Sequence, residues 1–205
     1  MSITMTILLI AMTVVVSIAG FGNTRVVEST IFSPPAVLRR REWHRLVTYG
    51  FVHADGTHLL FNMFTLYFFG TFVENVLRPR IGSVGYIVFY LAALVFSILP
   101  SLWRHRNDTR YLSLGASGAV SAVLFAFILL RPWQTIYVFV LPVPAILFAV
   151  AYVAYTIWAE RTRRDKVNHS AHLWGAAFGV IFLVALEPRT LGAFLEQLAH
   201  PRWNV

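Results

Sequence analysis

Long apolar blocks constrain the fold of this chain more than any other feature of its sequence. Six blocks stand out, with few or no charged residues inside them. They run approximately over Ile3–Phe21, Leu59–Leu77, Val84–Trp103, Leu114–Leu130, Trp133–Trp158 and Ala171–Leu186. Most approach the roughly 20 residues with which a helix crosses a hydrocarbon core of about 30 Å. Because lipid offers backbone groups no partner, each block is expected to form a transmembrane helix.

Composition supports this interpretation and limits the domain organisation. Of the 205 residues, 58% are hydrophobic and 13% are charged, whereas soluble domains carry about a quarter charged residues. The chain has no cysteine, which excludes disulfides and thiol chemistry. No repeat or long linker divides it. We therefore expect an all-α, polytopic membrane protein with one domain over residues 1–205 and a long, partly interfacial first loop over residues 22–57.

Charge indicates the partners of the chain. The net charge is +8, and basic runs such as Arg39–Arg41 lie beside helix ends, where anionic lipid head groups are simpler partners than nucleic acid. The first block lacks a basic leader and is long for a signal peptide, so a retained helix is expected. We expect a multi-pass protein of the plasma (inner) membrane. Loops 1, 3 and 5 hold 12 of the 17 Lys and Arg, and the positive-inside rule would place these loops in the cytoplasm.

Polar residues within spans are functional candidates, and three of them share a depth. Counted from the charged residue that ends each span, Ser117, His172 and Asn62 lie roughly 21, 22 and 24 Å from that end, at about 1.5 Å per residue. In a core of about 30 Å, all three then lie below the opposite surface, on the side of loops 1, 3 and 5. His58 lies one turn from Asn62 on the same helix face.

This set is chemically sufficient for hydrolysis. A serine hydroxyl becomes a nucleophile when a neutral histidine takes its proton. His58, Asn62 and the backbone N–H of Ser117 are candidate donors to a developing oxyanion. Because no Asp or Glu lies at this depth, the sequence predicts a dyad of Ser117 and His172 rather than a triad.

Simpler roles exist for several of these residues. A lone serine in a membrane helix usually bonds a backbone carbonyl, and Ser121 is expected to do so. Glu74 is expected to reach the membrane surface. Metal binding by His53, His58 and His172 finds no supporting motif spacing. Small residues suit close helix packing whether or not there is catalysis, and the candidates are Gly115, Gly118, Gly175 and Gly179.

Three motifs resemble those of rhomboid intramembrane serine proteases. Residues 115–118, Gly-Ala-Ser-Gly, resemble the family's GxSG motif. Residues 171–179 resemble its AHxxGxxxG motif, and residues 58–62 resemble its HxxxN motif. Residues 42–45, Glu-Trp-His-Arg, resemble its WR segment with one residue inserted. The α/β-hydrolase elbow G-x-S-x-G does not fit, because Ala119 occupies its fifth position.

The resemblance implies a six-helix rhomboid-like bundle that cleaves transmembrane protein substrates near the membrane surface. It implies that Ser117 is the nucleophile, that His172 is the general base, and that His58 and Asn62 join the Ser117 N–H in the oxyanion hole. It implies no metal or organic cofactor. Some members carry a tyrosine one turn after the serine, stacked on the histidine. Ser121 occupies that position here, so His172 must be oriented by another group.

Two alternatives stay open beside the protease. One is a non-catalytic relative that binds membrane helices, and the other is a small transporter, for which internal symmetry would be expected. The family's site faces the extracytoplasmic side with the N-terminus in the cytoplasm, which is the reverse of the orientation that the charge distribution favours. We expect the family's orientation.

Overall fold

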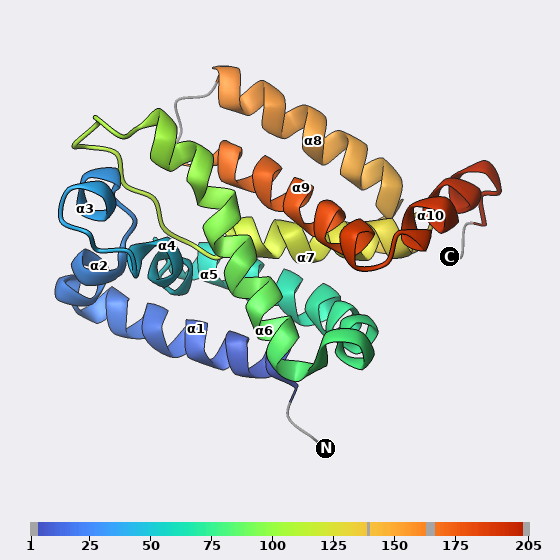
Figure 1. Ribbon diagram of the computed structural model, residues 1–205, viewed down its shortest axis with the longest axis horizontal. Helices are drawn as coiled ribbons and strands as arrows, with labels where there is room; N and C mark the ends of the chain where they lie inside the picture. The colour runs from blue at the N-terminus through green and yellow to red at the C-terminus, as the bar shows by residue number, and fades with distance from the viewer. Residues whose placement is uncertain (1–3, 139, 163–166, 203–205) are drawn as a thin grey trace.

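The computed structural model describes residues 4–138, 140–162 and 167–202, and this part of the chain is mostly helical, as the apolar blocks predict. Figure 1 shows α1 and α8 on opposite sides of a bundle, with α6, α7 and α9 between them. The longer helices are α1 Met5–Gly22, α5 Gly56–Thr65, α6 Thr71–Arg104, α7 Ser117–Leu130, α8 Ala145–Thr162, α9 His169–Leu186 and α10 Arg189–Ala199.

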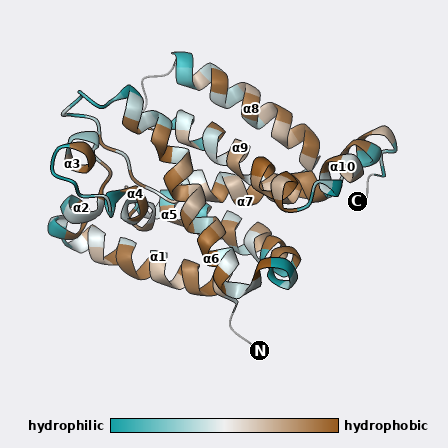
Figure 2. Ribbon diagram, viewed as in Figure 1, coloured by the Kyte–Doolittle hydropathy of each residue, from teal (hydrophilic) through white to brown (hydrophobic). Residues whose placement is uncertain are grey.

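The prediction of a helical membrane protein is confirmed, with fewer full spans than expected. Within the described residues, three helical stretches are long and apolar enough to cross a membrane, namely Met5–Gly22, Gly56–Arg104 and His169–Leu186. The apolar helix α7 has only 14 residues. Figure 2 shows apolar residues along these helices and polar residues gathered on loops and helix ends.

The longest of these stretches turns back on itself at Gly82. The φ angle of Gly82 is 70°, a conformation that residues with a Cβ rarely adopt. Beyond the turn, the Tyr86 hydroxyl donates to the carbonyl of Gly70 at 3.2 Å, so the returning segment lies beside the π-helical turn Leu66–Gly70, labelled η2. The stretch thus contains two of the predicted apolar blocks.

The predicted helix Trp133–Trp158 is wrong in its first half. Two antiparallel strands stand there instead, in which β1 (Thr135–Val138) pairs with β2 (Leu141–Pro144). Pro142 and Pro144 lack the N–H groups that a helix needs and clash with the preceding turn. The helix therefore begins only at Ala145, after the second proline.

The first loop is folded rather than extended. It contains α2 Thr24–Thr30, α3 Pro34–Leu38, α4 Arg45–Thr48 and the short 3-10 helix η1 Tyr49–Phe51. Arg45 is buried, pairs with Glu42, and donates to the carbonyls of Glu28 and Ile31 at 2.7 Å each. The guanidinium thereby ties three parts of the loop together beside the helix bundle.

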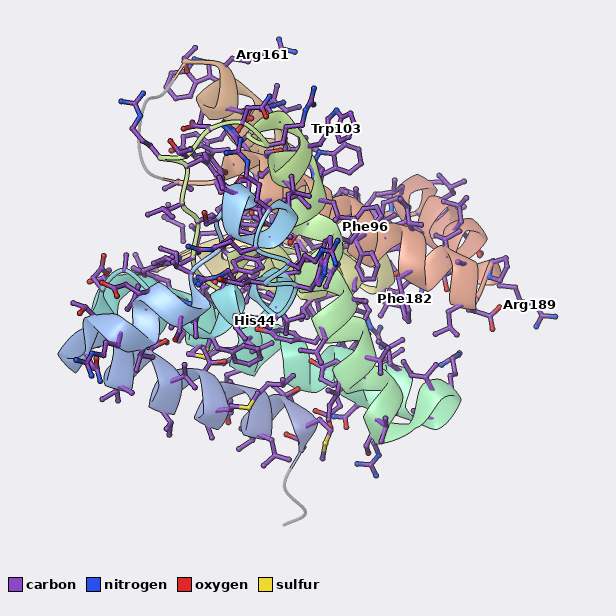
Figure 3. The ribbon with its side chains drawn as sticks, turned by 60° about the vertical axis from the view of Figure 1, so that its left-hand side comes forward. His44, Phe96, Trp103, Arg161, Phe182 and Arg189 are labelled. Atoms are coloured by element: carbon purple, nitrogen blue, oxygen red, sulfur yellow. The ribbon has the colours of Figure 1, made fainter. Side chains whose placement is uncertain are left out.

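The two ends of the bundle carry different contacts. At one end, Arg104 of α6 pairs with Glu160 of α8, and Figure 3 shows Trp103 and Arg161 there. Away from this end, aromatic side chains pack between α6 and α9. One such pair is Phe89 with Phe182, whose ring centroids are 4.8 Å apart. The C-terminal tail contains the helix α10. The Trp133 indole N–H donates to the Gln197 carbonyl and holds α10 against the segment that precedes β1.

Glu74 was expected to reach the membrane surface. It is instead buried within the bundle, and only 1% of the residue is exposed. Its carboxylate accepts hydrogen bonds from the N–H groups of Met5 and Thr6, both at 2.8 Å, and from the Thr6 hydroxyl at 2.7 Å. These are the first residues of α1, whose N–H groups have no acceptor within the helix. The carboxylate therefore caps α1 from within the bundle.

Candidate active site

One cavity brings the predicted site residues together. It has a volume of about 790 Å³ and lies among the first loop, α5, the segment before α7 and the start of α9. Ser117, His172, His58 and Asn62 all line it. Polar groups from Asp55, Thr57, Ser113 and Asn168 line it as well. The shared depth that the sequence predicted for three helices thus corresponds to a common cavity.

Ser117 is the first residue of α7 and is only partly buried. The predicted block began at Leu114, but residues 114–116 are not helical, because Gly115 has a φ of 111° and two amides bond elsewhere. The Gly115 N–H donates to the Tyr49 carbonyl at 2.9 Å, and the Ala116 N–H donates to Nε2 of His53 at 3.2 Å. The segment that delivers the serine is therefore held by the first loop.

His53 acts as a structural bridge in this arrangement. It is 3% exposed, and its Nδ1 lies 2.9 Å from the hydroxyl of Ser17. Ser17 donates its proton to the Phe51 carbonyl, so it accepts from Nδ1–H and leaves Nε2 free to accept from Ala116. Burial, with a smaller contribution from the His58 charge, lowers the pKa of His53 to about 3. The ring therefore stays neutral, as this pair of hydrogen bonds requires.

The start of α7 presents polarised N–H groups to the cavity. The first helical hydrogen bond at this end runs from the Val120 N–H to the Ala116 carbonyl at 3.0 Å. The N–H groups of the residues before Val120 have no acceptor within the helix, and the helix dipole adds partial positive charge there. An oxygen atom that gains negative charge beside Ser117 would be stabilised at this place.

His58 and Asn62 of α5 line the same cavity as Ser117. A Cβ built on Gly115 would lie 2.5 Å from Cε1 of His58, so the imidazole packs directly on the glycine backbone. The Asn62 amide donates to the His58 carbonyl at 2.9 Å, and Asp55 caps the helix by accepting from the His58 N–H at 2.8 Å. The Asp55 carboxylate is thus engaged at the start of α5.

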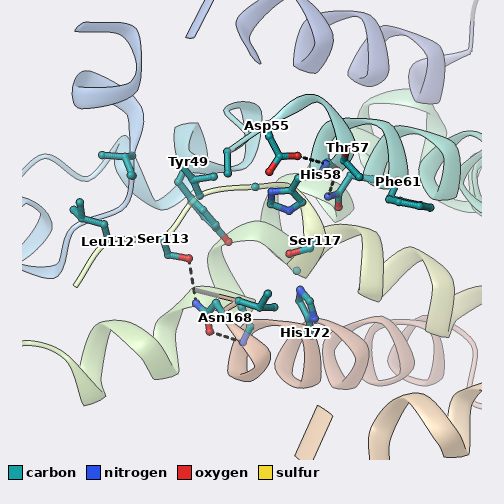
Figure 4. A pocket seen from close by; sticks show the side chains of 18 residues that line it. Tyr49, Asp55, Thr57, His58, Phe61, Leu112, Ser113, Ser117, Asn168 and His172 are labelled. Atoms are coloured by element: carbon teal, nitrogen blue, oxygen red, sulfur yellow. Dashed lines mark hydrogen bonds between the residues drawn. The ribbon is translucent and has the colours of Figure 1, made fainter. Parts of the chain in front are cut away.

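His172 faces Ser117 from α9. Figure 4 shows the Ser117 hydroxyl between the imidazole of His172 and the imidazole of His58. Asn168 caps the start of α9 by accepting from the Ala171 N–H at 3.0 Å, and its amide donates to the Ser113 hydroxyl at 3.3 Å. This amide ties the helix that carries His172 to the chain just before Ser117.

The backbones of α7 and α9 touch. A Cβ built on Gly179 would lie 2.1 Å from the carbonyl oxygen of Ala122. On the side of α6, a Cβ built on Gly118 would lie 2.3 Å from the hydroxyl oxygen of Ser97. Only a residue without a side chain allows such an approach. The four glycines noted in the sequence therefore lie where the structure has no room for a Cβ or, at Gly115, where φ is positive as well.

Sequence reasoning missed three residues near this site. His53 was considered as a possible metal ligand, and its bond to the Ala116 N–H was not foreseen. Asn168 lies outside the apolar blocks, although an Asn before a helix is a capping signal. Tyr152 of α8 stacks on His172 and gave no signal in the sequence. Among the described residues, no cluster of three His, Asp or Glu side chains is arranged to hold a metal ion.

Comparisons with known proteins agree on one family. A family model described as the Rhomboid domain matches residues 40–189. The RHOMBOID-like protein 12, mitochondrial, of Arabidopsis thaliana is 35% identical over 150 residues, which are 67% of this chain and 45% of that protein. The Rhomboid protein 1, mitochondrial, of Saccharomyces cerevisiae is 29% identical over 177 residues, which are 82% of this chain and 50% of that protein.

A third relative extends the range of organisms. The Presenilin-associated rhomboid-like protein, mitochondrial, of Rattus norvegicus is 32% identical over 139 residues, covering 65% of this chain and 35% of that protein. The chain spans about half the length or less of these curated relatives. The part of the chain that the family model matches includes all the motif residues.

Proposed function

Because this chain belongs to the rhomboid family, we propose that it is an intramembrane serine endopeptidase that cleaves transmembrane protein substrates near the membrane surface. The observation that carries the proposal is the juxtaposition of Ser117 and His172 in one cavity, on two helices whose backbones touch. A nucleophile and a base held at the start of two packed helices need little reorganisation before reaction.

In the proposed reaction, the Ser117 oxygen attacks the scissile carbonyl carbon while His172 takes the serine proton. The carbonyl oxygen becomes an oxyanion beside the Ser117 N–H, with His58 and Asn62 as further donors. The C–N bond then breaks, His172 returns the proton to the leaving amine, and a serine ester remains. Water, activated by His172, hydrolyses the ester and restores the free hydroxyl.

Water has to reach a serine that lies below the membrane surface. Ser117 is partly exposed to the cavity, and hydroxyl, amide and carboxylate groups line the cavity toward the loops. The short helix α7 supports this arrangement, because it begins only at the cavity, with Ser117 as its first residue. A substrate helix would have to unwind near its end to place a peptide bond there, because helical backbone groups are already paired.

The second candidate is a non-catalytic rhomboid-like protein that binds membrane helices. It predicts the same fold and the same close packing of α7 and α9. The presence of both Ser117 and His172 in the cavity favours the protease, since a binding protein needs neither.

Cleavage of a model transmembrane substrate by the reconstituted protein tests the proposal. We expect cleavage by the wild type and its loss in both Ser117→Ala and His172→Ala, each of which should keep the thermal unfolding midpoint of the wild type. Ser29→Ala is a matched control, because Ser29 is an exposed serine bonded to the Val26 carbonyl. Undiminished cleavage by Ser117→Ala would contradict the dyad, and binding of the substrate without cleavage by the wild type would favour the second candidate.

The chain is an integral membrane protein, and its compartment and orientation are part of the proposal. We propose the plasma (inner) membrane with the cavity facing the extracytoplasmic side, although the three relatives described above are mitochondrial by name. Membrane fractionation would decide the compartment. A reporter fused after Val205 and detected outside the cytoplasm would contradict the orientation.

A further inference from the structure

We propose that Tyr152 of α8 is a positioning residue that sets the orientation of the His172 imidazole, an inference that rests on the proposed function. The two rings are nearly parallel, with centroids 6.2 Å apart and planes inclined by 26°. Aromatic pairs at such separations favour offset stacking. An imidazole against a fixed ring has fewer accessible rotations than one in an open cavity.

Tyr152 is itself held in place by contacts with α7 and with its own helix. Its hydroxyl lies 2.7 Å from the hydroxyl of Ser121 on α7. Its ring packs against Phe125 of α7 at 5.5 Å and against Phe148 of α8 at 5.7 Å between centroids. These contacts fix the position of Tyr152 relative to α7. The fixed tyrosine ring in turn limits where the His172 imidazole can lie.

The contact with Ser121 connects Tyr152 to the helix that carries the nucleophile. Ser117 and Ser121 are one turn apart on the same face of α7. Ser121 was expected to bond a backbone carbonyl, but its hydroxyl meets the Tyr152 hydroxyl instead. Tyr152 thus links the turn below the nucleophile with the ring of the base, across three helices.

The stack of Tyr152 on His172 would also stabilise the positive charge that His172 acquires during the reaction. When His172 takes the Ser117 proton, the imidazole becomes a cation, and the face of an aromatic ring attracts a cation. Tyr152 would then stabilise the protonated base as well as limit its rotation. Both effects depend on α8 lying against α7 and α9, because Tyr152 is on α8.

Two kinetic readouts distinguish this role from substrate binding or general packing. One is kcat and KM for a reconstituted transmembrane substrate, and the other is the rate at which a small fluorophosphonate labels Ser117. A fluorophosphonate needs an activated serine but no transmembrane docking. We expect Tyr152→Leu to lower both kcat and the labelling rate roughly 10- to 100-fold with KM within about twofold, because misplacement of a reacting group by about 1 Å costs that much.

The hydroxyl contact is tested by a double-mutant cycle. Tyr152→Phe keeps the ring and Ser121→Ala keeps the tyrosine, so each should lower kcat only about 2- to 10-fold, the equivalent of one hydrogen bond. Because both remove the same contact, the double variant should be no slower than either single variant. Trp158→Leu is the control, since it removes a large, half-exposed ring from the same helix and should leave both rates unchanged.

The outcomes separate this inference from the proposed function. Unchanged labelling in Tyr152→Leu, with or without slower cleavage, would overturn the positioning role while leaving the protease proposal intact. Equal losses in Tyr152→Phe and Tyr152→Leu would also overturn it, because the ring would then be irrelevant. If the wild type neither cleaves nor labels, the protease proposal fails. The stack is then still tested by the ring-proton resonances of His172, which should shift in Tyr152→Leu and not in Trp158→Leu.

Discussion

Gly175 of α9 lies so close to Gly118 of α7 that a Cβ built on Gly175 would be 2.0 Å from the Gly118 carbonyl oxygen. The obstacle is backbone, which cannot rotate away as a side chain can. We expect Gly175→Ala to push the helices apart and to lower the free energy of unfolding by about 1–3 kcal/mol, the usual cost of overpacking a core. Thermal unfolding in detergent measures this change.

The control for this prediction is Gly192→Ala on α10, where a Cβ would meet nothing within 4 Å. Alanine favours a helix over glycine by up to about 1 kcal/mol, so this variant should be as stable as the wild type or slightly more stable. Equal midpoints for Gly175→Ala and the wild type would show that the two helices do not depend on this contact.

Asn62→Ala should slow cleavage without abolishing it. Loss of one oxyanion donor typically costs about 10²–10³ in kcat, and KM should change little, because the oxyanion exists only during reaction. Thr65→Ala is a matched control. Thr65 is on the same helix and bonds the Phe61 carbonyl much as Asn62 bonds the His58 carbonyl. A similar loss of kcat in both variants would indicate damage to α5 instead of a missing donor.

His53 should make stability depend on pH. Its pKa in the folded protein is about 3, below the ordinary value of 6.5, because it is buried and lies beside His58, while Asp55 acts in the opposite direction. Between these pH values the unfolded chain binds a proton that the folded protein does not, so the free energy of unfolding falls as the pH falls from about 6.5 toward 3.

This pH effect is measured by unfolding midpoints of the wild type and His53→Gln from pH 7 to pH 4. The variant keeps a polar side chain but has no group that titrates in this range, so its midpoint should fall less steeply. Parallel curves for the two proteins would mean that His53 does not contribute to the acid sensitivity.

Glu74→Gln should loosen the start of α1. The carboxylate accepts three hydrogen bonds from Met5 and Thr6, and an amide can replace only part of this set. We expect a loss of about 1–3 kcal/mol in the free energy of unfolding and faster hydrogen exchange in the first turn of α1. The exposed Glu196 provides the control Glu196→Gln, which should match the wild type in both measurements.

Apolar blocks and motif spacing were sufficient to predict a helical membrane protein and several of the residues that line the cavity. Ser117, His172 and Asn62 could be placed at one depth, with His58 one turn away, because the rise of a helix is regular. The α7 and α9 glycines could be assigned to close packing, because small residues at helical spacing have few other uses in a membrane helix.

Other features depend on contacts between residues distant in sequence. Hydrophobicity alone could not separate the paired strands β1 and β2 from a helix, although the two prolines of β2 are a helix-breaking signal. The stack of Tyr152 on His172 depends on how α8 docks, and the bond from Ala116 to His53 depends on the fold of the first loop. Neither pairing has a local pattern that a sequence could reveal.

Every residue from Gly118 to Leu129 is buried, so the helix that begins with Ser117 offers almost no surface to lipid. A change in bilayer thickness acts on helices that touch acyl chains, which tilt or strain to match it. The outer helices α1 and α8, with exposed residues such as Val15 and Val150, would respond first. Lipid composition should therefore have little effect on the depth of Ser117. The helix α8, which carries Tyr152, is in direct contact with lipid.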